Sequence, residues 1–468
     1  MVHQEIYSLV KEKRNKKSEK INRKTHQTFG GFFIFTKPNL KTLTIAELYT
    51  IYQQFPNVQT DTRKIQKGDL FFALKGPSFD GNNFAQQAIE QGAAYAIVDN
   101  PICAKGQQFI LVEDVLTTLQ QLARYHRMQF AIPFIAVTGS NGKTTSKELM
   151  TAVLRTQFVT YATEGNLNNH IGVPLTLLKI KSDAAVAVIE MGANHQQEIA
   201  SYCAIALPTH AVINNCGKAH IEGFGGIEGV RKGKGELYDF IRFNGGTIFR
   251  NVDLDYLSEM AHDIANQITY GSSHADYIGS IISNELMLQV AVSTKGTNVQ
   301  LDTQLVGDYN FPNVMLAVAV GAYFGVPITQ IKSAIEAYHP DNSRSQLVNK
   351  GSNQIILDAY NANPTSMRAA ILNFSRLEGD KMLWLGAMKE MGQDEAKEHE
   401  ELLHYVAQWQ WSDIVLVGDE FKPFKGQFNW FATADEAAHF IAQNKPQDAM
   451  ILIKGSRGSK MEKLFEQL

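Results

Sequence analysis

The chain has 468 residues, of which 44% are hydrophobic and 19% charged, and its formal net charge is −3. This length predicts roughly two to four domains, and the near-neutral charge argues against a nucleic-acid-binding or membrane-surface protein. Its cysteines, Cys103, Cys203 and Cys216, form no CxxC pair. A disulfide framework or zinc site is therefore not expected, and we predict a cytoplasmic protein.

Residues 1–40 differ from the rest of the chain. They hold nine Lys or Arg against three Glu, a net charge of +6. We interpret them as a solvated, poorly ordered extension, the alternative being a basic arm for nucleic acid or membranes. No apolar run reaches the roughly 18 residues of a membrane span, and no signal-peptide cleavage pattern follows the basic stretch. We expect no membrane insertion.

Three blocks with different element patterns follow the extension. In the first, 41–131, helices are predicted after the N-cap Thr44 and at 84–91. Short strands are predicted within 69–75 and at 95–98. This mixture predicts a small mixed α/β domain.

The second and third blocks alternate apolar strands with helices, which predicts parallel sheets with helices on both faces. In the second block, 132–339, we predict strands at 133–138, 185–190, 209–214 and 246–249, helices at 198–204 and 234–241, and a buried helix at 314–326. In the third block, 340–468, we predict strands at 354–357, 381–385, 414–417 and 450–453, with helices at 366–374 and 398–406.

The strongest local signal is the sequence TGSNGKTT at 138–145, between a predicted strand and a predicted helix. The backbone N–H groups of such a turn can bind phosphate oxygens, with Lys143 reaching the β/γ-phosphates and the Thr144 hydroxyl binding Mg²⁺. The turn is shorter than a standard P-loop, because Gly139 lies three residues before Gly142 rather than five. We predict nucleotide binding; the alternative is a structural turn.

Three further side chains are candidates with weaker signals. Glu190 ends an apolar strand, at the edge of a parallel sheet where ligands bind, and carboxylates suit Mg²⁺. His220 follows the next strand, which favours a metal or acid–base role. Lys234 is predicted near the start of a helix. The alternatives are a solvated carboxylate, a surface histidine and a solvated lysine.

Several segments together resemble the Mur ligases of peptidoglycan synthesis. Besides TGSNGKTT, they are TDTRKIQKGDLFFALKG (60–76), EGNLNNHIGVPLTLL (164–178), IEMGANH (189–195), NNCGKAHIEGFGG (214–226), GDYNFPNVMLAVAVG (307–321), SRSQ (343–346), LDAYNANPTSMRAAI (357–371) and IKGSRGSKME (453–462). The YNANP, SMRAA and KGSR segments are similar to those of the branch that adds D-alanyl-D-alanine. The resemblance runs from about residue 41 to the end and follows the family's order.

The resemblance implies a three-domain architecture: a UDP-substrate-binding domain (41–131), a central ATP-binding domain (132–339) and a C-terminal Rossmann-like domain (340–468). It implies an ATP- and Mg²⁺-dependent ligase whose partners are UDP-N-acetylmuramoyl-tripeptide and D-alanyl-D-alanine. The terminal carboxylate would become an acyl phosphate, which the amine of the dipeptide then attacks. A monomer that binds no nucleic acid is expected.

The resemblance also implies roles for individual residues. The ATP-binding set is Gly139, Ser140, Asn141, Gly142, Lys143, Thr144, Thr145, Asn310, Asn313, Arg344 and Asp358. Thr144 and Glu190 would hold one metal ion, and Glu190 and His220 a second, assisted by Lys234 as a carbamate for which the adjacent glycines leave room. Lys143, His220 and Lys234 form the catalytic set. The substrate-binding set is Asp61, Thr62, Arg63, Lys75 and Gly76 for UDP, Asn168 and Asn169 for the peptide, and Asn361 and Asn363 for the dipeptide.

Alternatives stay open for two of these residue sets, and one position departs from the family's pattern. Asn310 and Asn313 suit helix capping as well as adenine binding, and 61–63 suit an ordinary polar turn. Many members of this branch read LGDM where this chain reads LGAM at 385–388, so Ala387 replaces an aspartate. If that aspartate orders the dipeptide site, the affinity for the dipeptide is in question. The alternative functions are a ligase that adds the third amino acid, a folylpolyglutamate synthase, and a non-catalytic nucleotide-binding relic.

Overall fold

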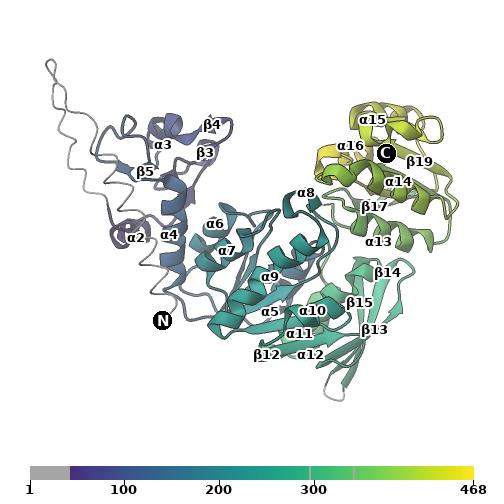
Figure 1. Cartoon of the computed structure of the whole chain (residues 1–468), viewed down its shortest axis with the longest axis horizontal. Coiled ribbons are helices and arrows are strands. Elements are labelled where there is room, and N and C mark those ends of the chain that lie inside the picture. The colour runs from purple at the N-terminus through teal and green to yellow at the C-terminus, as the bar shows by residue number, and fades with distance from the viewer. Residues whose placement is uncertain (1–42, 295–296, 341–342) are drawn as a thin grey trace, which may run out of the picture. The chain divides into compact units, whose positions relative to one another are not determined.

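The structure is a computed structural model that describes residues 43–294, 297–340 and 343–468. The predicted basic extension, residues 1–40, lies outside the described residues. The described strands form three main sheets, of four, nine and six strands, and a two-stranded hairpin (Figure 1). Each main sheet is built from one of the three sequence blocks.

The first sheet is entirely parallel, in the order β1-β2-β5-β6. Helix α2 begins after Thr44, whose hydroxyl accepts from the backbone of Glu47 while the Glu47 carboxylate accepts in return, so the predicted N-cap is a full capping box. The elements are α2 (Ile45–Gln54), β1 (Val58–Gln59), β2 (Leu70–Phe72), β3 (Lys75–Gly76), β4 (Phe79–Asp80), α3 (Ala85–Glu90), β5 (Tyr95–Val98), β6 (Phe109–Leu111) and α4 (Val115–Arg127).

The central sheet has the order β15-β14-β13-β12-β11-β10-β7-β9-β8. Its strands are β7 (Phe134–Thr138), β8 (Thr160–Ala162), β9 (Val186–Glu190), β10 (His210–Ile213), β11 (Thr247–Asn251), β12 (Asn266–Gly271), β13 (Tyr277–Ser283), β14 (Met287–Thr294) and β15 (Thr297–Val306). The strands from β8 to β13 pair in parallel, whereas β14 and β15 extend the sheet in antiparallel pairing. The sheet that the sequence predicted as parallel is therefore mixed at one edge.

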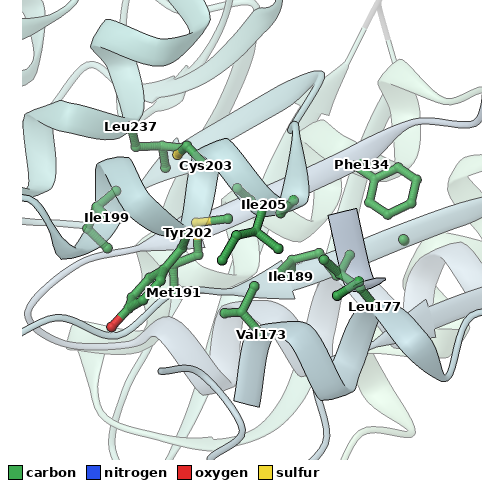
Figure 2. Close-up of a cluster of buried hydrophobic side chains, with 14 of the residues drawn as sticks. Phe134, Val173, Leu177, Ile189, Met191, Ile199, Tyr202, Cys203, Ile205 and Leu237 are labelled. Carbon is green, nitrogen blue, oxygen red and sulfur yellow. The ribbon is translucent and has the colours of Figure 1, made fainter. Parts of the chain in front are cut away.

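Two hydrophobic clusters cover the two faces of the central sheet. Figure 2 shows one of them, in which Phe134 and Ile189 from the strands meet side chains such as Val173, Tyr202 and Leu237. The last three side chains come from the helices on this face, α6 (Gly172–Leu178), α7 (Glu198–Ala206) and α9 (Ile227–Asn244). The other face packs on α5 (Lys143–Arg155), α11 (Phe311–Tyr323) and α12 (Ile328–Glu336). The core thereby fixes the strand ends that carry the polar candidates.

The third sheet has the order β16-β17-β21-β18-β19-β20, with only β16 antiparallel. Its strands are β16 (Gln346–Lys350), β17 (Asn353–Asp358), β18 (Lys381–Gly386), β19 (Asp413–Val417), β20 (Asn429–Phe431) and β21 (Met450–Lys454). Its helices are α13 (Pro364–Ser375), α14 (Glu395–Val406), α15 (Ala434–Gln443) and α16 (Glu462–Glu466). The predicted second doubly wound sheet is confirmed.

Two details of the element predictions were wrong. Lys234 lies in the middle of α9, which begins at Ile227, seven residues earlier than predicted from the glycine-rich sequence around it. The strands β12 to β15 were missed, although the alternation of buried and more exposed residues in β15, from Leu301 to Leu305, is a local strand signal. No helix in the described part of the chain has the length and apolar character needed to cross a bilayer.

Candidate functional site

A cavity of about 850 Å³ lies where the central and third sheets both contribute side chains. Sixteen of the predicted site residues line it: Ser140, Asn141, Gly142, Lys143, Thr144, Thr145, Asn168, Asn169, Glu190, His220, Asn310, Asn313, Arg344, Asp358, Asn361 and Asn363. Many of them follow carboxyl ends of strands, which is where open α/β sheets bind ligands. Gly139, Lys234 and the five UDP candidates do not line it.

The glycine-rich turn connects β7 to the first turn of α5. Gly142 has a left-handed backbone (φ 79°), and a Cβ there would meet Asn313 Oδ1 at 2.6 Å, so only glycine suits this position. Lys143 Nζ folds back and donates to the Gly139 carbonyl at 2.6 Å. Burial lowers the pKa of the Lys143 amine, an effect that Glu190 opposes. The helix N-terminus and this amine together give the turn a positive potential suited to phosphate.

A second loop, after β10, holds the glycine-rich turn in place. The Asn215 side chain accepts from the backbone of Asn141 at 3.0 Å and donates to its carbonyl at 3.2 Å. Ser140 donates from its hydroxyl to the Gly217 carbonyl at 2.9 Å. The turn is therefore fixed by hydrogen bonds from its neighbour and does not depend on a ligand for its shape.

The predicted adenine-binding asparagines form a buried hydrogen-bond network. Asn313 Oδ1 accepts from the Ser146 hydroxyl at 2.9 Å, and Asn313 Nδ2 donates to Asn310 Oδ1 at 2.8 Å. Asn310 in turn donates to the Val306 carbonyl at 2.8 Å. Asn214 Nδ2 donates to Ser146, whereas its buried Oδ1 has no partner among the described residues. Asn310 and Asn313 thus join the short helix η3 (Asp308–Asn310) and α11 to the start of α5 while they line the cavity.

Glu190 is a buried carboxylate that forms no direct ion pair with a described residue, although its charge interacts with that of the Lys143 amine. Its side chain is 1% exposed, and its oxygens accept from the Thr144 hydroxyl at 3.0 Å and from Asn168 Nδ2 at 2.7 Å. Because a buried anion is costly without a counter-charge, the pairing of this carboxylate with a threonine hydroxyl fits a divalent cation.

His220 and Lys234, which were predicted to share a metal ion with Glu190, contact other groups in the structure. His220, in a left-handed conformation (φ 54°), pairs through Nδ1 with the Glu390 carboxylate from the third sequence block. Lys234 is 1% exposed, and its Nζ donates to the Ala193 carbonyl at 3.0 Å. Burial lowers the pKa of Lys234 to about 7, and the nearby Lys143 adds to this shift. No group of three or more His, Cys, Asp or Glu side chains in the described residues is arranged to hold a metal.

The glycines beside Lys234 do not simply leave open room, as the sequence suggested. A Cβ on Gly233 would meet the Phe224 ring at 2.4 Å, so this glycine lets α9 pack against Phe224. The Lys234 ammonium lies 5.2 Å from the centre of the same ring. The predicted second metal set of Glu190, His220 and Lys234 stays a prediction.

The third sheet contributes a cation-rich group to the cavity. Asp358, at the end of β17, accepts from Lys454 at the end of β21 over 2.5 Å. The Arg344 guanidinium lies 3.6 Å from the centre of the Tyr360 ring and forms no ion pair with a described residue. Arg344 is therefore available to a ligand anion, as expected for a phosphate-binding residue.

Four predicted substrate asparagines have structural contacts as well. Asn363 caps α13 and donates from Nδ2 to Asn141 Oδ1 at 2.7 Å, joining that helix to the glycine-rich turn. Asn361 accepts from the Ala362 backbone, and Asn169 accepts from the backbone at the start of α6. Asn168 contacts Glu190. Substrate contacts by these four stay predictions.

The predicted UDP residues lie in the first block. Asp61 accepts two hydrogen bonds from the Arg63 guanidinium, at 2.9 and 2.8 Å, and this pairing lowers the pKa of Asp61 to about 2. Lys75 pairs with Asp99 at 2.7 Å. Thr62 lies in the short helix that Asp61 caps, and Gly76 packs on Phe79. UDP contacts by these five residues stay predictions.

Comparisons with known proteins place these features in one family. Three family models match: the Mur ligase family catalytic domain at 54–127, the Mur ligase middle domain at 137–321 and the Mur ligase glutamate ligase domain at 343–457. A relative from Bacillus subtilis, named UDP-N-acetylmuramoyl-tripeptide–D-alanyl-D-alanine ligase, is 35% identical over 88% of this chain and 92% of its own length. The chain belongs to the Mur ligase family.

Solved structures of Mur ligases agree with this assignment. The MurF crystal structure from Acinetobacter baumannii matches with a TM-score of 0.80 and 33% identity, over 88% of this chain and 93% of that one. The MurF ligase of Thermotoga maritima in complex with ADP matches with a TM-score of 0.79 and 26% identity, over 88% and 96%. The predicted three-domain Mur ligase architecture and the family resemblance are confirmed.

Some cavity residues of this Mur ligase were not assigned from the sequence. They include Asn214, Asn215, Tyr309, Tyr360, Thr365 and Lys454. Lys454 could have been found, because it directly follows the strand predicted at 450–453, whose carboxyl end lies at the edge of the sheet where ligands bind. Asn215 and Tyr360 lie in quoted motifs, but only the folded loops show that they contact the glycine-rich turn and Arg344.

Proposed function

We propose that this Mur ligase joins D-alanyl-D-alanine to UDP-N-acetylmuramoyl-tripeptide at the expense of ATP, in peptidoglycan precursor synthesis in the cytoplasm. The observation that carries the proposal is one cavity lined by the glycine-rich turn and Glu190 from the central sheet and by Arg344, Asp358 and Lys454 from the third. The named activity of the Bacillus subtilis relative, at 35% identity over nearly its whole length, supports the choice of substrates.

The reaction has two steps. The terminal carboxylate of the tripeptide attacks the γ-phosphorus of ATP, the bond to the β,γ-bridging oxygen breaks, and an acyl phosphate and ADP result. The amine of the dipeptide then attacks the acyl carbon, loses a proton and displaces phosphate. Because carboxylate and triphosphate repel each other, the first step depends on positive groups: the Lys143 amine, the α5 N-terminus and the Arg344 guanidinium.

Thr144 and Glu190 are the residues that would hold Mg²⁺. Their contact at 3.0 Å joins a hydroxyl to a buried carboxylate that forms no direct ion pair with a described residue, and Mg²⁺ accepts oxygen ligands of this kind. When bound, the ion would neutralise phosphate charge. Asn168 keeps the carboxylate oriented through its hydrogen bond to Oε1.

We assign Lys234 as the carbamoylated lysine. An amine must be neutral to react with carbon dioxide, and burial lowers the pKa of Lys234 to about 7, so a large neutral fraction exists near neutral pH. Protein incubated with ¹³C-labelled carbon dioxide should give one carbamate resonance that is missing in Lys234→Ala. A spectrum with no such resonance, or one kept in the variant, would remove this assignment.

The deciding measurement is phosphate release from ATP and Mg²⁺ with UDP-N-acetylmuramoyl-tripeptide, with and without D-alanyl-D-alanine. We expect release only when both are present. Lys143→Ala should lower the rate by about 100-fold or more, because a preorganised charge at the γ-phosphate is lost. The control is Lys179→Ala, which removes an exposed lysine paired with Glu164 outside the cavity and should leave the rate unchanged.

Other outcomes would overturn the proposal. Release that requires UDP-N-acetylmuramoyl-dipeptide and a free diamino acid would identify a ligase of the preceding step. Nucleotide binding without release for any acceptor would identify a relic and direct attention to Ala387.

A further inference from the structure

Glu420 is a buried carboxylate that lies outside the cavity. It belongs to the short helix η5 (Asp419–Phe424), which follows the carboxyl end of β19 in the third sheet. Asp358 and Lys454 lie at the carboxyl ends of two other strands of the same sheet. Its side chain is only 10% exposed. One oxygen pairs with Lys389, and the other, Oε2, is buried without a hydrogen-bond partner among the described residues. A half-satisfied buried carboxylate is costly, which calls for an explanation.

The unpartnered oxygen of Glu420 and the side chain of Ala387 both lie next to Gly418. A Cβ built on Gly418 would lie 2.7 Å from Ala387 Cβ and 2.7 Å from Glu420 Oε2. The Ala387 methyl and the Glu420 carboxylate therefore share one small space, bounded by the Gly418 backbone. A side chain longer than alanine at 387 would have to compete with Glu420 for this space.

The segment 387–392 connects this space to the cavity. On one side, the Ala387 carbonyl accepts from the Ser456 hydroxyl at 2.6 Å, two residues after the cavity lysine Lys454. Within the segment, the Met388 backbone donates to His399 Nε2 at 3.0 Å. On the other side, Glu390 pairs with the cavity residue His220. Lys389, the partner of Glu420, lies between these contacts.

We propose that Glu420 is a positioning residue for the ligase reaction: through Lys389, its carboxylate holds the segment 387–392 so that Glu390 meets His220. The inference rests on the proposed function. Glu420 then does from the end of β19 what a carboxylate at 387 could do from the end of β18.

The electrostatics of the pair agree with this role. Burial, the largest single effect, raises the pKa of Glu420, but the hydrogen bonds from Lys389 and from the residue's own backbone, together with the charges of Lys389 and His399, outweigh burial, so the net pKa is lowered. The carboxylate is therefore charged at neutral pH and attracts Lys389. Glu390 has a left-handed backbone (φ 63°), a conformation that costs free energy in a non-glycine residue and needs its neighbours to hold it.

The first test compares Glu420→Gln with Asp419→Asn. Both remove one negative charge at the end of β19, but Asp419 is exposed and forms no ion pair with a described residue. For Glu420→Gln we expect faster amide hydrogen exchange in 387–392 and a kcat lower by about tenfold to a hundredfold, as for a small misplacement of reacting groups. The KM for ATP should stay within about twofold, because the glycine-rich turn is untouched. Asp419→Asn should match the wild type.

The second test moves the carboxylate. Ala387→Asp alone should lower kcat, because two carboxylates would then compete for one space and one lysine. Glu420→Ala alone should lower it as well. The double variant Glu420→Ala/Ala387→Asp should recover kcat to within about threefold of wild type, since interacting sites are non-additive.

The outcomes separate this inference from the proposed function. Hydrogen exchange in 387–392 is measured without substrates, so it reports on Glu420 even if the wild type proves inactive with these acceptors. Unchanged exchange in Glu420→Gln, or a double variant no better than the worse single variant, would overturn the positioning role. A wild type that releases no phosphate would overturn the proposed function alone.

Discussion

At His210, the burial of one imidazole links the stability of the central sheet to pH. The side chain lies at the start of β10, at the end of the strand away from the cavity loop. Its Nδ1 lies 2.8 Å from the Thr209 hydroxyl, and its ring packs against Phe249, Tyr323 and Phe324. Burial lowers the pKa of His210 to about 4, so the folded protein keeps this group neutral in mildly acidic solution.

The sign of the pH effect follows from proton binding. Between the unfolded pKa of about 6.5 and the folded pKa of about 4, the unfolded chain binds a proton that the folded chain does not. The free energy of unfolding should therefore fall as the pH drops through this window, by up to about 1.4 kcal/mol per pH unit from this one group. Urea unfolding at several pH values between 4 and 7 would measure the slope.

Two variants isolate the contribution of His210. His210→Phe keeps an aromatic ring and should make the slope shallower, although His126 and His399, whose pKa values burial also lowers, retain part of it. His262→Phe removes a histidine whose side chain is 79% exposed and should leave the slope unchanged. Equal slopes in wild type and His210→Phe would contradict the assignment.

Residue positions at strand ends could be predicted from the sequence, whereas their contacts could not. Glu190 was found because it ends an apolar strand, and it is buried in the cavity as that rule implies. The sequence could not show that Asn313 would bond to Ser146 across 167 residues, or that Glu390 would meet His220. Such pairs depend on tertiary packing, for which a single sequence carries no local pattern.

At the scale of elements, α9 shows how packing can reverse a helix propensity. Replacing an interior helical glycine with alanine ordinarily stabilises a protein by about 1 kcal/mol. Gly233 is an exception, because an added Cβ would meet the Phe224 ring at 2.4 Å and the ring is buried. We expect Gly233→Ala to lower the free energy of unfolding by about 1–3 kcal/mol, the usual cost of overpacking.

Gly235 provides the matched control in the same helix. Its added Cβ would meet only the flexible end of Met260, at 3.4 Å. Gly235→Ala should therefore be neutral or stabilising by up to about 1 kcal/mol. Denaturant unfolding of both variants measures the difference, and a Gly233→Ala variant as stable as Gly235→Ala would show that Phe224 moves aside at little cost.

The elements themselves were predictable to different degrees. The N-cap at Thr44 and the strand–turn–helix at the glycine-rich turn carry explicit local signals and were predicted correctly. The start of α9 was misplaced because Gly229, Gly233 and Gly235 weaken the helical pattern. The antiparallel strands β14 and β15 were missed although the apolar and polar residues of β15 alternate, a local pattern that could have predicted a strand.

At the scale of the whole molecule, nucleotide binding should stabilise the chain through both sheets at once. The cavity takes Lys143 and Thr144 from the central sheet region and Arg344 and Asp358 from the third sequence block. A ligand that binds only the folded protein raises its stability by RT ln(1 + [L]/Kd), about 2.7 kcal/mol at a hundredfold excess over Kd. We expect ADP with Mg²⁺ to raise the thermal midpoint with the logarithm of its concentration once that concentration exceeds Kd.

Arg344→Ala tests whether the third block contributes to this stabilisation. The guanidinium stacks on Tyr360 and has no ion pair with a described residue, so its removal should weaken nucleotide binding by about tenfold, typical of one lost charge-assisted contact. At a fixed ADP concentration the midpoint shift should shrink, while the midpoint without ADP changes little. Arg368→Ala, which removes an arginine paired with Glu401 away from the cavity, should keep the full shift. If Arg344→Ala kept the full shift as well, the Arg344 guanidinium would have no part in holding the nucleotide.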